Sequence, residues 1–300
     1  MTEELYALFR RNFPYVLRNA DTVRELLSRK ENTVFAYRDD AGALRGACVC
    51  AGSTVYLLCV DEPYRRKGIG GKLLAKAEGA IRAEGFGRIN IGVGDSYLTP
   101  GVPVLHHWYE TVNAAPDPRL TDEARLFLEK RGYRHDCDAD IFDMRMDLSG
   151  RPCQGIRPGD TAEGILYRWA EEKDLPAVLA CVEDAWDEFA KYYRNAALYR
   201  GEVRERVLAA FDGDTVCGSI IVSLETEAEK TGSSGCTAVR PAYRGRHIAT
   251  HMVKAAAEAL KEAGMREAAL GYTYTGLDKL YGSAGYRISV YYMMAAKDLV

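Results

Sequence analysis

The stretch VDEPYRRKGIGGKLLAKAEGAIRAE, residues 60–84, joins the end of an apolar strand to a basic, glycine-rich turn and an amphipathic helix. A second copy, VRPAYRGRHIATHMVKAAAEALKEA, occupies residues 239–263. The apolar helix positions recur in it with a period near 3.6 residues: Ile69, Leu73, Leu74, Ala77 and Ile81 correspond to Ile248, Met252, Val253, Ala256 and Leu260. The chain therefore contains a strand–turn–helix unit twice.

Each turn has the chemistry of a phosphate cradle. Basic side chains are followed by small residues at a helix start, where unpaired backbone N–H groups and the positive end of the helix dipole attract anions. Two common phosphate motifs do not fit. Gly71-Lys72 is followed by Leu73 rather than by Ser or Thr, and the intervals between Gly68, Gly70 and Gly71 differ from those of a dinucleotide fingerprint. Neither motif supports a nucleotide-binding kinase or a dehydrogenase.

The arrangement Arg65-x-x-Gly68-x-Gly70, after a strand and opening a helix, resembles a known acetyl-CoA pyrophosphate loop. That loop belongs to the GCN5-related N-acetyltransferase (GNAT) superfamily, with the pattern Arg/Gln-x-x-Gly-x-Gly/Ala. The resemblance implies a first cradle, which we define as residues 65–72 together with Val60. The residues implied to bind acetyl-CoA here are Val60, Arg65, Arg66, Lys67, Gly68, Ile69, Gly70, Gly71 and Lys72.

The second copy contains the second cradle, which we define as residues 244–250 together with Val239. It resembles the acetyl-CoA loop less closely than the first cradle does. His247 stands where a glycine usually lets backbone approach the pyrophosphate, and a tolerated substitution explains it better than a catalytic histidine does. The residues implied to bind acetyl-CoA here are Val239, Arg244, Gly245, Arg246, His247, Ile248, Ala249 and Thr250.

The resemblance also implies a role for the strand before the cradle. In the superfamily this strand splays from its neighbour, and a backbone N–H near Val60 would polarise the thioester carbonyl.

Length and composition bound the architecture. The 300 residues, 47% of them hydrophobic, suffice for two ordinary domains with proper cores. We predict an α/β fold of two tandem GNAT-like domains, each a twisted mixed sheet with helices on both faces. Domain 1 is expected at 1–149 and domain 2 at 163–300, joined by a linker at 150–162 that is rich in Pro and Gly. In domain 1 we expect a first helix that Pro14 bends or ends, and strands at 33–38, 44–51 and 54–60. In domain 2 we expect helices at 173–193 and 201–210, with a strand at 207–211 as the alternative for the end of the second helix.

Several partners are not expected. A net charge of −3 predicts no general affinity for nucleic acid. No run resembles a signal peptide or a membrane span, so we expect a soluble, cytoplasmic protein without a membrane partner. The eight cysteines lack a CxxC pair and are interpreted as buried small hydrophobes. No His/Cys/carboxylate set has ligand spacing, so no metal is predicted.

Domain 1 carries an insert at about 96–121 that has no counterpart in the second copy. It is too long for a plain connection, so we expect a functional loop. Its phrase YLTPGVP resembles a bacterial GNAT subgroup with a Pro-Gly-Val-Pro loop. His106 and His107, beside Trp108 and Tyr109, could serve as base, acid or substrate platform, or could simply fold onto the domain surface. His135 and His251 show no motif.

Tyr281, in the phrase LDKLYGSAGYR, is the catalytic candidate. In the superfamily a tyrosine on the last helix, before a Gly-aromatic pair, protonates the departing CoA thiolate. A neutral phenol suits that task, although an ordinary half-buried helix tyrosine would have the same spacing. The equivalent residue in domain 1 is Leu128, which cannot donate a proton. The first copy thus has the better cradle and the second the better acid.

The implied activity is direct transfer of an acetyl group from acetyl-CoA to a primary amine of a small molecule or peptide. Glu225, Glu227 and Asp184 are candidate bases, and a solvated charged face explains them as well. Mild acidity suits a cationic acceptor such as a polyamine, an aminoglycoside or a peptide N-terminus. Alternatively, one or both domains bind acetyl-CoA without turnover, as a sensor or structural module. A homodimer is left open.

Overall fold

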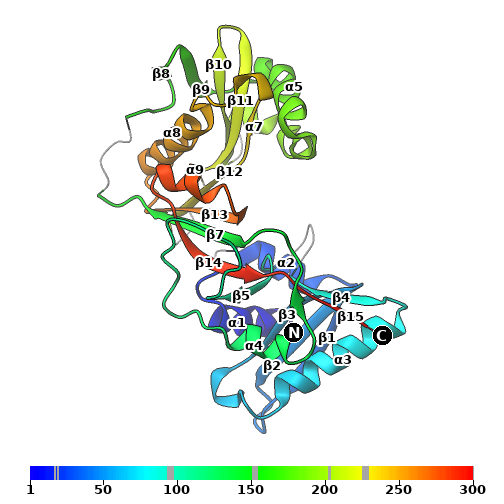
Figure 1. Ribbon diagram of the computed structural model, residues 1–300. Helices are drawn as coiled ribbons and strands as arrows, with labels where there is room; N and C mark the ends of the chain where they lie inside the picture. Colours follow the sequence, from blue (N-terminus) through cyan, green and yellow to red (C-terminus); the bar gives the residue numbers. More distant parts are fainter. Residues whose placement is uncertain are drawn as a thin grey trace. The chain divides into compact units, whose positions relative to one another are not determined.

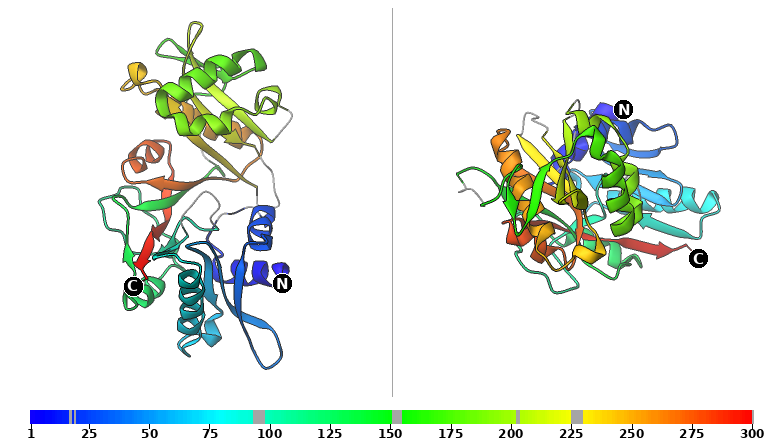
Figure 2. Two further views of the ribbon diagram at one scale, coloured as in Figure 1. Left: turned by 90° about the vertical axis from the view of Figure 1, so that its right-hand side faces the viewer. Right: turned by 90° about the horizontal axis from the view of Figure 1, so that it is seen from above.

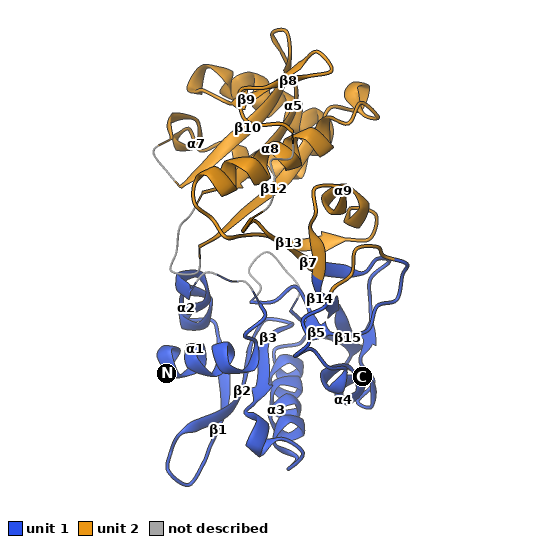
Figure 3. Ribbon diagram, turned by 90° about the vertical axis from the view of Figure 1, so that its left-hand side faces the viewer, with its two compact units in different colours: residues 1–110, 116–142, 289–300 blue, residues 111–115, 143–288 orange. Residues whose placement is uncertain are grey.

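The chain forms two compact units, each with its own mixed sheet and helices (Figures 1 and 3). The computed structural model describes residues 1–16, 18, 20–92, 98–150, 155–201, 204–224 and 230–299. Unit 1 contains residues 1–110, 116–142 and 289–300, and unit 2 contains 111–115 and 143–288. The predicted fold class is confirmed, while the domain boundaries read from the repeat stay a prediction.

Unit 1 follows the sequence pattern closely in its first half. The predicted strands at 33–38, 44–51 and 54–60 are confirmed, and the first helix ends before Pro14. Its elements are α1 (Thr2–Asn12), α2 (Ala20–Ser28), β1 (Thr33–Arg38), β2 (Leu44–Ala51), β3 (Thr54–Val60), η1 (Glu62–Tyr64), α3 (Ile69–Ala83), β4 (Arg88–Ile91), β5 (Val102–Val104), α4 (Glu123–Glu129), β6 (Arg134–His135) and, from the C-terminal end, β15 (Ala295–Asp298).

Alternation along β2 places helices on both faces of this sheet. Ala47 and Val49 share a buried cluster with Phe9 and other apolar residues of α1. On the other face Gly46 lies against Leu73 of α3, so closely that an added Cβ would come within 3.4 Å of that side chain. Three strands between two helical layers provide the burial that a domain of this size needs.

Unit 2 repeats the plan with a longer sheet. Figure 2 shows α5, in green, beside the yellow strands of this sheet. In sequence order its elements are most of β7 (Ile141–Asp147), β8 (Thr161–Ala162), β9 (Ile165–Trp169), η2 (Glu172–Asp174), α5 (Leu175–Trp186), η3 (Asp187–Phe189), α6 (Ala190–Tyr193), α7 (Ala197–Arg200), β10 (Glu205–Asp212), β11 (Thr215–Ser223), β12 (Thr231–Val239), η4 (Pro241–Tyr243), α8 (Ile248–Glu262), β13 (Glu267–Tyr274), α9 (Asp278–Ser283) and the start of β14 (Arg287–Met293), whose residues from Ser289 onward belong to unit 1.

Two sequence-based helix predictions in unit 2 were wrong. A helix expected at 201–210 is largely strand β10, because residues 205–212 pair with β11 around the tight turn at Gly213. A single helix expected at 173–193 is divided into α5, η3 and α6. The break lies at Trp186, whose φ of −167° and ψ of 95° are extended rather than helical.

Each sheet contains a strand from the other half of the sequence. In unit 1 the strand order is β1-β2-β3-β4-β15-β6, so the last strand of the second repeat lies between β4 and β6 of the first. In unit 2, β7 of the first repeat lies next to β13, the place that β15 has next to β4. The final strands of the two repeats have been exchanged.

The described cysteines are all free, and most are buried. Burial raises the pKa of the Cys48 and Cys59 thiols far above their ordinary value, which keeps them protonated and apolar in character. Among the helices of the described ranges, none has the length and apolar character needed to cross a membrane.

Candidate active site

The first cradle leads into α3 through two residues whose backbone is left-handed. Arg66 has φ 63° and Gly68 has φ 79°, both in the left-handed region. Gly68 is the N-cap of α3, no side chain caps the helix, and its first backbone bond runs from Lys72 N to Gly68 O at 3.1 Å. The N–H groups of the residues between them precede the helical ladder and point out of its positive end.

The second cradle reproduces this backbone with a different residue order. Here Gly245 has φ 78° and His247 has φ 56°, at the positions equivalent to Arg66 and Gly68. His247 is the N-cap of α8, again without a side-chain cap, and His251 N donates to His247 O at 2.9 Å. Each cradle thus has two left-handed residues, only one of which is a glycine.

A cavity of about 270 Å³ lies over the second cradle. Its wall includes both ends of the predicted motif, from the last residue of β12 to the first turn of α8. It is lined by Val239, Tyr243, Arg244, Gly245, His247, Ile248, Ala249 and Thr250. Of these, only Tyr243 was not singled out from the sequence. The predicted residues therefore come together around one hollow beside uncapped N–H donors.

Replacing His247 with glycine is expected to stabilise unit 2 by about 1 kcal/mol, because a side chain in the left-handed region is strained and glycine is not. Thermal unfolding would show a higher midpoint. Gly245→Ala is the matched control at the neighbouring left-handed position of the same turn, and it is expected to lower the midpoint. A lower midpoint for His247→Gly would contradict the assignment of strain.

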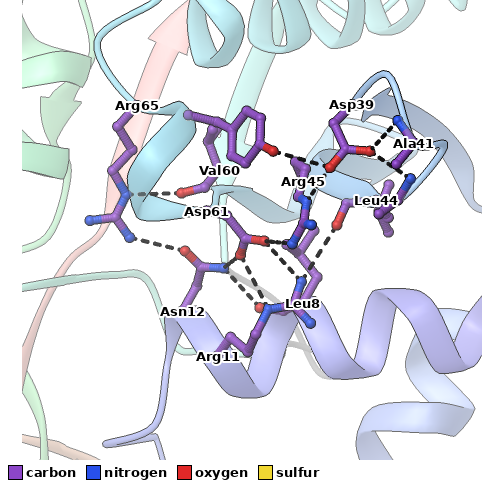
Figure 4. A network of polar contacts seen from close by, with 12 residues as sticks. Leu8, Arg11, Asn12, Asp39, Ala41, Leu44, Arg45, Val60, Asp61 and Arg65 are labelled. Carbon is purple, nitrogen blue, oxygen red and sulfur yellow. Dashed lines mark hydrogen bonds and ion pairs between the residues drawn. The ribbon is translucent and has the colours of Figure 1, made fainter.

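A polar network fixes the end of β3 in unit 1 (Figure 4). Arg65 Nε donates to Val60 O at 2.8 Å, and its Nη2 donates to Asn12 Oδ1 at 2.9 Å. Asp61, only 8% exposed, accepts from Arg11 at 3.0 Å and from Asn12 at 3.0 Å. The network ties α1 to the strand that leads into the first cradle, so it positions the cradle against the sheet.

Two residues of α4 and its C-terminal end lie on the first cradle and were missed by sequence reasoning. An added Cβ on Gly70 would lie 3.6 Å from the Phe127 ring, and one on Gly71 would lie 3.1 Å from Arg131 Nη2. The Arg131 guanidinium stands 3.8 Å from the Phe127 ring centroid. Arg131 thus adds a positive charge at the positive end of α3. Gly71 and Arg131 are 60 positions apart in the sequence, so only the three-dimensional structure reveals this contact.

The strand before the second cradle parts from its parallel neighbour. β12 pairs with β13 at Thr231, Gly232 and Ser233, whereas both strands continue beyond these pairs, β12 as far as Val239. Backbone groups at such a strand end are available to a ligand, which is the arrangement that the resemblance implied. In unit 1, β3 pairs with β4 at Thr54 and Val55, and the residues directly after Gly92 lie outside the described ranges.

Tyr281 lies on α9 and reaches β12. It is 6% exposed, and its hydroxyl is 3.2 Å from Thr237 Oγ1. Thr237 follows Cys236, whose φ of 52° marks an irregularity where one extra residue of β12 faces β11. Burial raises the pKa of the Tyr281 phenol, while the Thr237 hydrogen bond lowers it. The phenol is therefore neutral near pH 7 and can donate a proton beside the strand that leads to the second cradle.

Leu128 occupies the equivalent place in unit 1 and is 2% exposed in the core. Of the insert histidines, His106 packs edge-on to Trp108, and the indole stacks on His135 with centroids 3.9 Å apart. His107 stacks on Tyr291 at 5.3 Å. The carboxylates of Asp122 and Asp140 accept backbone N–H bonds from the same loop, which they fold onto unit 1.

The candidate bases have different outcomes. Asp184 on α5 forms an ion pair with Arg240 at 3.2 Å and is about half exposed, which fits the solvated-face interpretation. Glu225 and Glu227 lie outside the described residues. His251 hydrogen-bonds the Tyr167 hydroxyl at 3.1 Å. Within the described part of the chain, no group of three or more His, Cys, Asp or Glu residues could hold a metal ion.

Family models assign both halves of the chain alike. A model described as the acetyltransferase (GNAT) family matches residues 166–286, and one described as an acetyltransferase (GNAT) domain matches residues 30–135. The two matches contain the two cradles. The chain belongs to the GNAT superfamily. It is a tandem GNAT N-acetyltransferase, with one such domain in each half of its sequence.

Solved structures of GNAT proteins, one of them a tandem protein, resemble this GNAT chain. A tandem GNAT protein from the clavulanic acid biosynthesis pathway has 16% identity and a TM-score of 0.71, covering 100% of this chain and 95% of its own. A GCN5-related N-acetyltransferase from Sphaerobacter thermophilus has 18% identity and a TM-score of 0.65, with coverages of 99% and 92%.

A longer protein also contains this GNAT fold. The structure of a fungal multi-domain β-N-acetylglucosaminidase with a GCN5-related glucosamine N-acetyltransferase region matches at 20% identity and a TM-score of 0.70. The match covers 99% of this chain but only 37% of that one. At these identities the likeness shows the fold alone. A sequence search among curated proteins found no match.

Proposed function

We propose that unit 2 transfers an acetyl group from acetyl-CoA to a primary amine, with Tyr281 as general acid. The observation that supports this most is the contact between the buried Tyr281 phenol and β12, the strand that leads to an uncapped helix N-terminus beside a cavity. A phosphate-binding terminus and a proton donor against the same strand suit a thioester substrate that has both a pyrophosphate and a departing sulfur.

The cavity residues would hold acetyl-CoA as co-substrate. The N–H groups that open α8 and the exposed Arg244 and Arg246 would bind its pyrophosphate. The backbone N–H near Val239 would stabilise the oxyanion. A neutral amine attacks the thioester carbonyl, so that a C–N bond forms and the C–S bond breaks. The thiolate then takes the Tyr281 proton, and the nitrogen loses a proton to solvent or to a base.

The first cradle has the more typical glycine pattern and an added cation, Arg131, but Leu128 replaces the acid. We propose that unit 1 binds acetyl-CoA and that its turnover, if it has a separate acceptor, uses another donor. In the alternative, unit 1 binds acetyl-CoA without catalysis and serves regulation or structure. The observation that supports this alternative is Leu128, which is buried in the core where a general acid would stand and cannot donate a proton.

Calorimetric titration with acetyl-CoA tests the binding part of this proposal. Two sites are expected, one lost in Gly68→Trp and the other in Ala249→Trp, because a large side chain would fill each cradle. Release of CoA thiol should then be followed with spermidine, kanamycin and a peptide with a free N-terminus as acceptors. We expect Ala249→Trp to abolish release. A single site lost only with Gly68→Trp would move catalysis to unit 1, and no binding would overturn the proposal.

A further inference from the structure

Five residues of the domain 1 insert belong to unit 2. Residues 111–115 cluster there, whereas the chain on either side of them clusters in unit 1. Asn113 O accepts from Ile288 N at 2.9 Å, and Ala115 N donates to Ile288 O at 2.9 Å. The segment therefore runs as an extra strand-like bridge beside the start of β14, directly after α9.

The same segment contacts the start of α9 through a buried carboxylate. Asp278, the first residue of α9, is 2% exposed. Its Oδ2 accepts from Val112 N at 2.6 Å, and its Oδ1 accepts from Gly276 N at 2.9 Å. A buried carboxylate with two backbone donors is a strong and directional contact. The insert backbone and the turn before α9 are thus held to one side chain.

Asn113 also lies against Gly282, which follows Tyr281 near the C-terminal end of α9. A Cβ added to Gly282 would come within 2.7 Å of Asn113 Cγ and closer still to Nδ2, which is too near for any real contact. Asn113 itself has φ 60° and donates from Nδ2 to Asp278 O at 3.4 Å. A glycine within a helix normally costs stability relative to alanine. Here it makes room for the insert at the residue after the candidate acid.

We infer that residues 111–115 position α9, and that Asn113 is a positioning residue which sets where the Tyr281 hydroxyl lies. This rests on the proposed function of Tyr281. The helix has only six residues, too few to be stable or fixed in place alone. Its placement therefore comes from its neighbours, and the insert supplies contacts at its first residue and at Gly282. The insert of the first repeat is in this way part of the second repeat's machinery.

Gly282→Ala is the direct test. The added methyl group overlaps the Asn113 side chain, so that side chain or α9 must move, and either movement removes the contact that positions α9. A displacement near 1 Å of a catalytic group can lower kcat by about 10²-fold. We expect that loss in CoA thiol release with the best acceptor of the three-amine panel, with acetyl-CoA affinity by calorimetry unchanged. Gly79→Ala is the matched control, because its Cβ would meet nothing within 4 Å.

Rescue separates positioning from general damage. Asn113→Gly keeps the left-handed backbone and removes the overlapping side chain. We therefore expect the double variant Asn113→Gly with Gly282→Ala to recover at least about 10-fold in kcat over Gly282→Ala alone. A double-mutant cycle on thermal unfolding should show the same coupling without reference to activity.

The outcomes are distinguishable from failure of the proposed function. If Tyr281→Phe lowers turnover but Gly282→Ala does not, the positioning inference is wrong and the general acid stands. If Gly282→Ala lowers turnover and the double variant shows no recovery, Asn113 is not the positioning contact and the inference also fails. If Tyr281→Phe leaves turnover unchanged, the proposed function fails and this inference fails with it.

Discussion

Replacing Tyr281 with phenylalanine is expected to lower kcat for CoA release by about 10²-fold or more, the upper range of a single general acid's contribution being near 10⁴-fold. Acetyl-CoA affinity should stay the same, because the hydroxyl lies against Thr237 on β12 rather than in the wall of the cavity. Calorimetry and thiol release on the same preparation measure the two quantities separately.

The pH dependence gives a second readout of the same group. Burial raises the pKa of the Tyr281 phenol above its ordinary value. The acid is therefore protonated through neutral pH, and kcat should fall only as the pH rises through that raised pKa. We expect this alkaline limb in the wild type and its absence in Tyr281→Phe, whose residual activity has no phenol to lose its proton.

A matched control is available in Tyr286→Phe. Tyr286 is fully buried in the same unit, and its hydroxyl is 3.4 Å from Ser234 of β12, further from the strand end. Loss of that hydroxyl tests the general cost of removing a buried phenolic group. Turnover that survives in Tyr286→Phe and collapses in Tyr281→Phe supports the acid. Unaltered turnover in Tyr281→Phe would make Tyr281 a core tyrosine.

The local parts of this fold could be predicted because they are encoded locally. The helices that begin at Ile69 and Ile248 follow from apolar periodicity, and the strand at 54–60 follows from a β-branched and aromatic run between turns. The residues that line the cavity over the second cradle all lie within the short stretch 239–250, so one motif identified nearly all of them.

The parts that could not be predicted depend on long-range pairing. An apolar strand pattern shows that a strand is buried but not which sheet receives it, so the exchange of β7 and β15 has no local signal. Arg131 beside Gly71 and Asn113 beside Gly282 are likewise contacts between distant segments. The misjudged helix at 201–210 has a similar cause, since pairing with β11 determines the state of those residues.

Because β15 completes the sheet of unit 1, a substitution near the end of the chain is expected to lower the stability of that unit strongly. Ala296 lies in the middle of β15, opposite Asn90 of β4 and Arg134 of β6, and is 2% exposed. A proline inside a strand with a neighbour on each side removes a ladder donor and clashes with the pairing. Ala296→Pro is therefore expected to destabilise unit 1 by about 3 kcal/mol or more, a large share of a domain's stability.

The consequence for binding follows from which sheet β15 completes. Ala296→Pro should weaken or abolish the acetyl-CoA site that Gly68→Trp removes, although residue 296 belongs to the second repeat, and should spare the site that Ala249→Trp removes. Ala296→Gly keeps the backbone N–H and isolates the side chain, with an expected cost of about 1 kcal/mol. Calorimetric site counting with thermal unfolding measures both effects. Loss of the second site with retention of the first would mean that the last strand serves the sheet of its own repeat, and the exchange would be wrong.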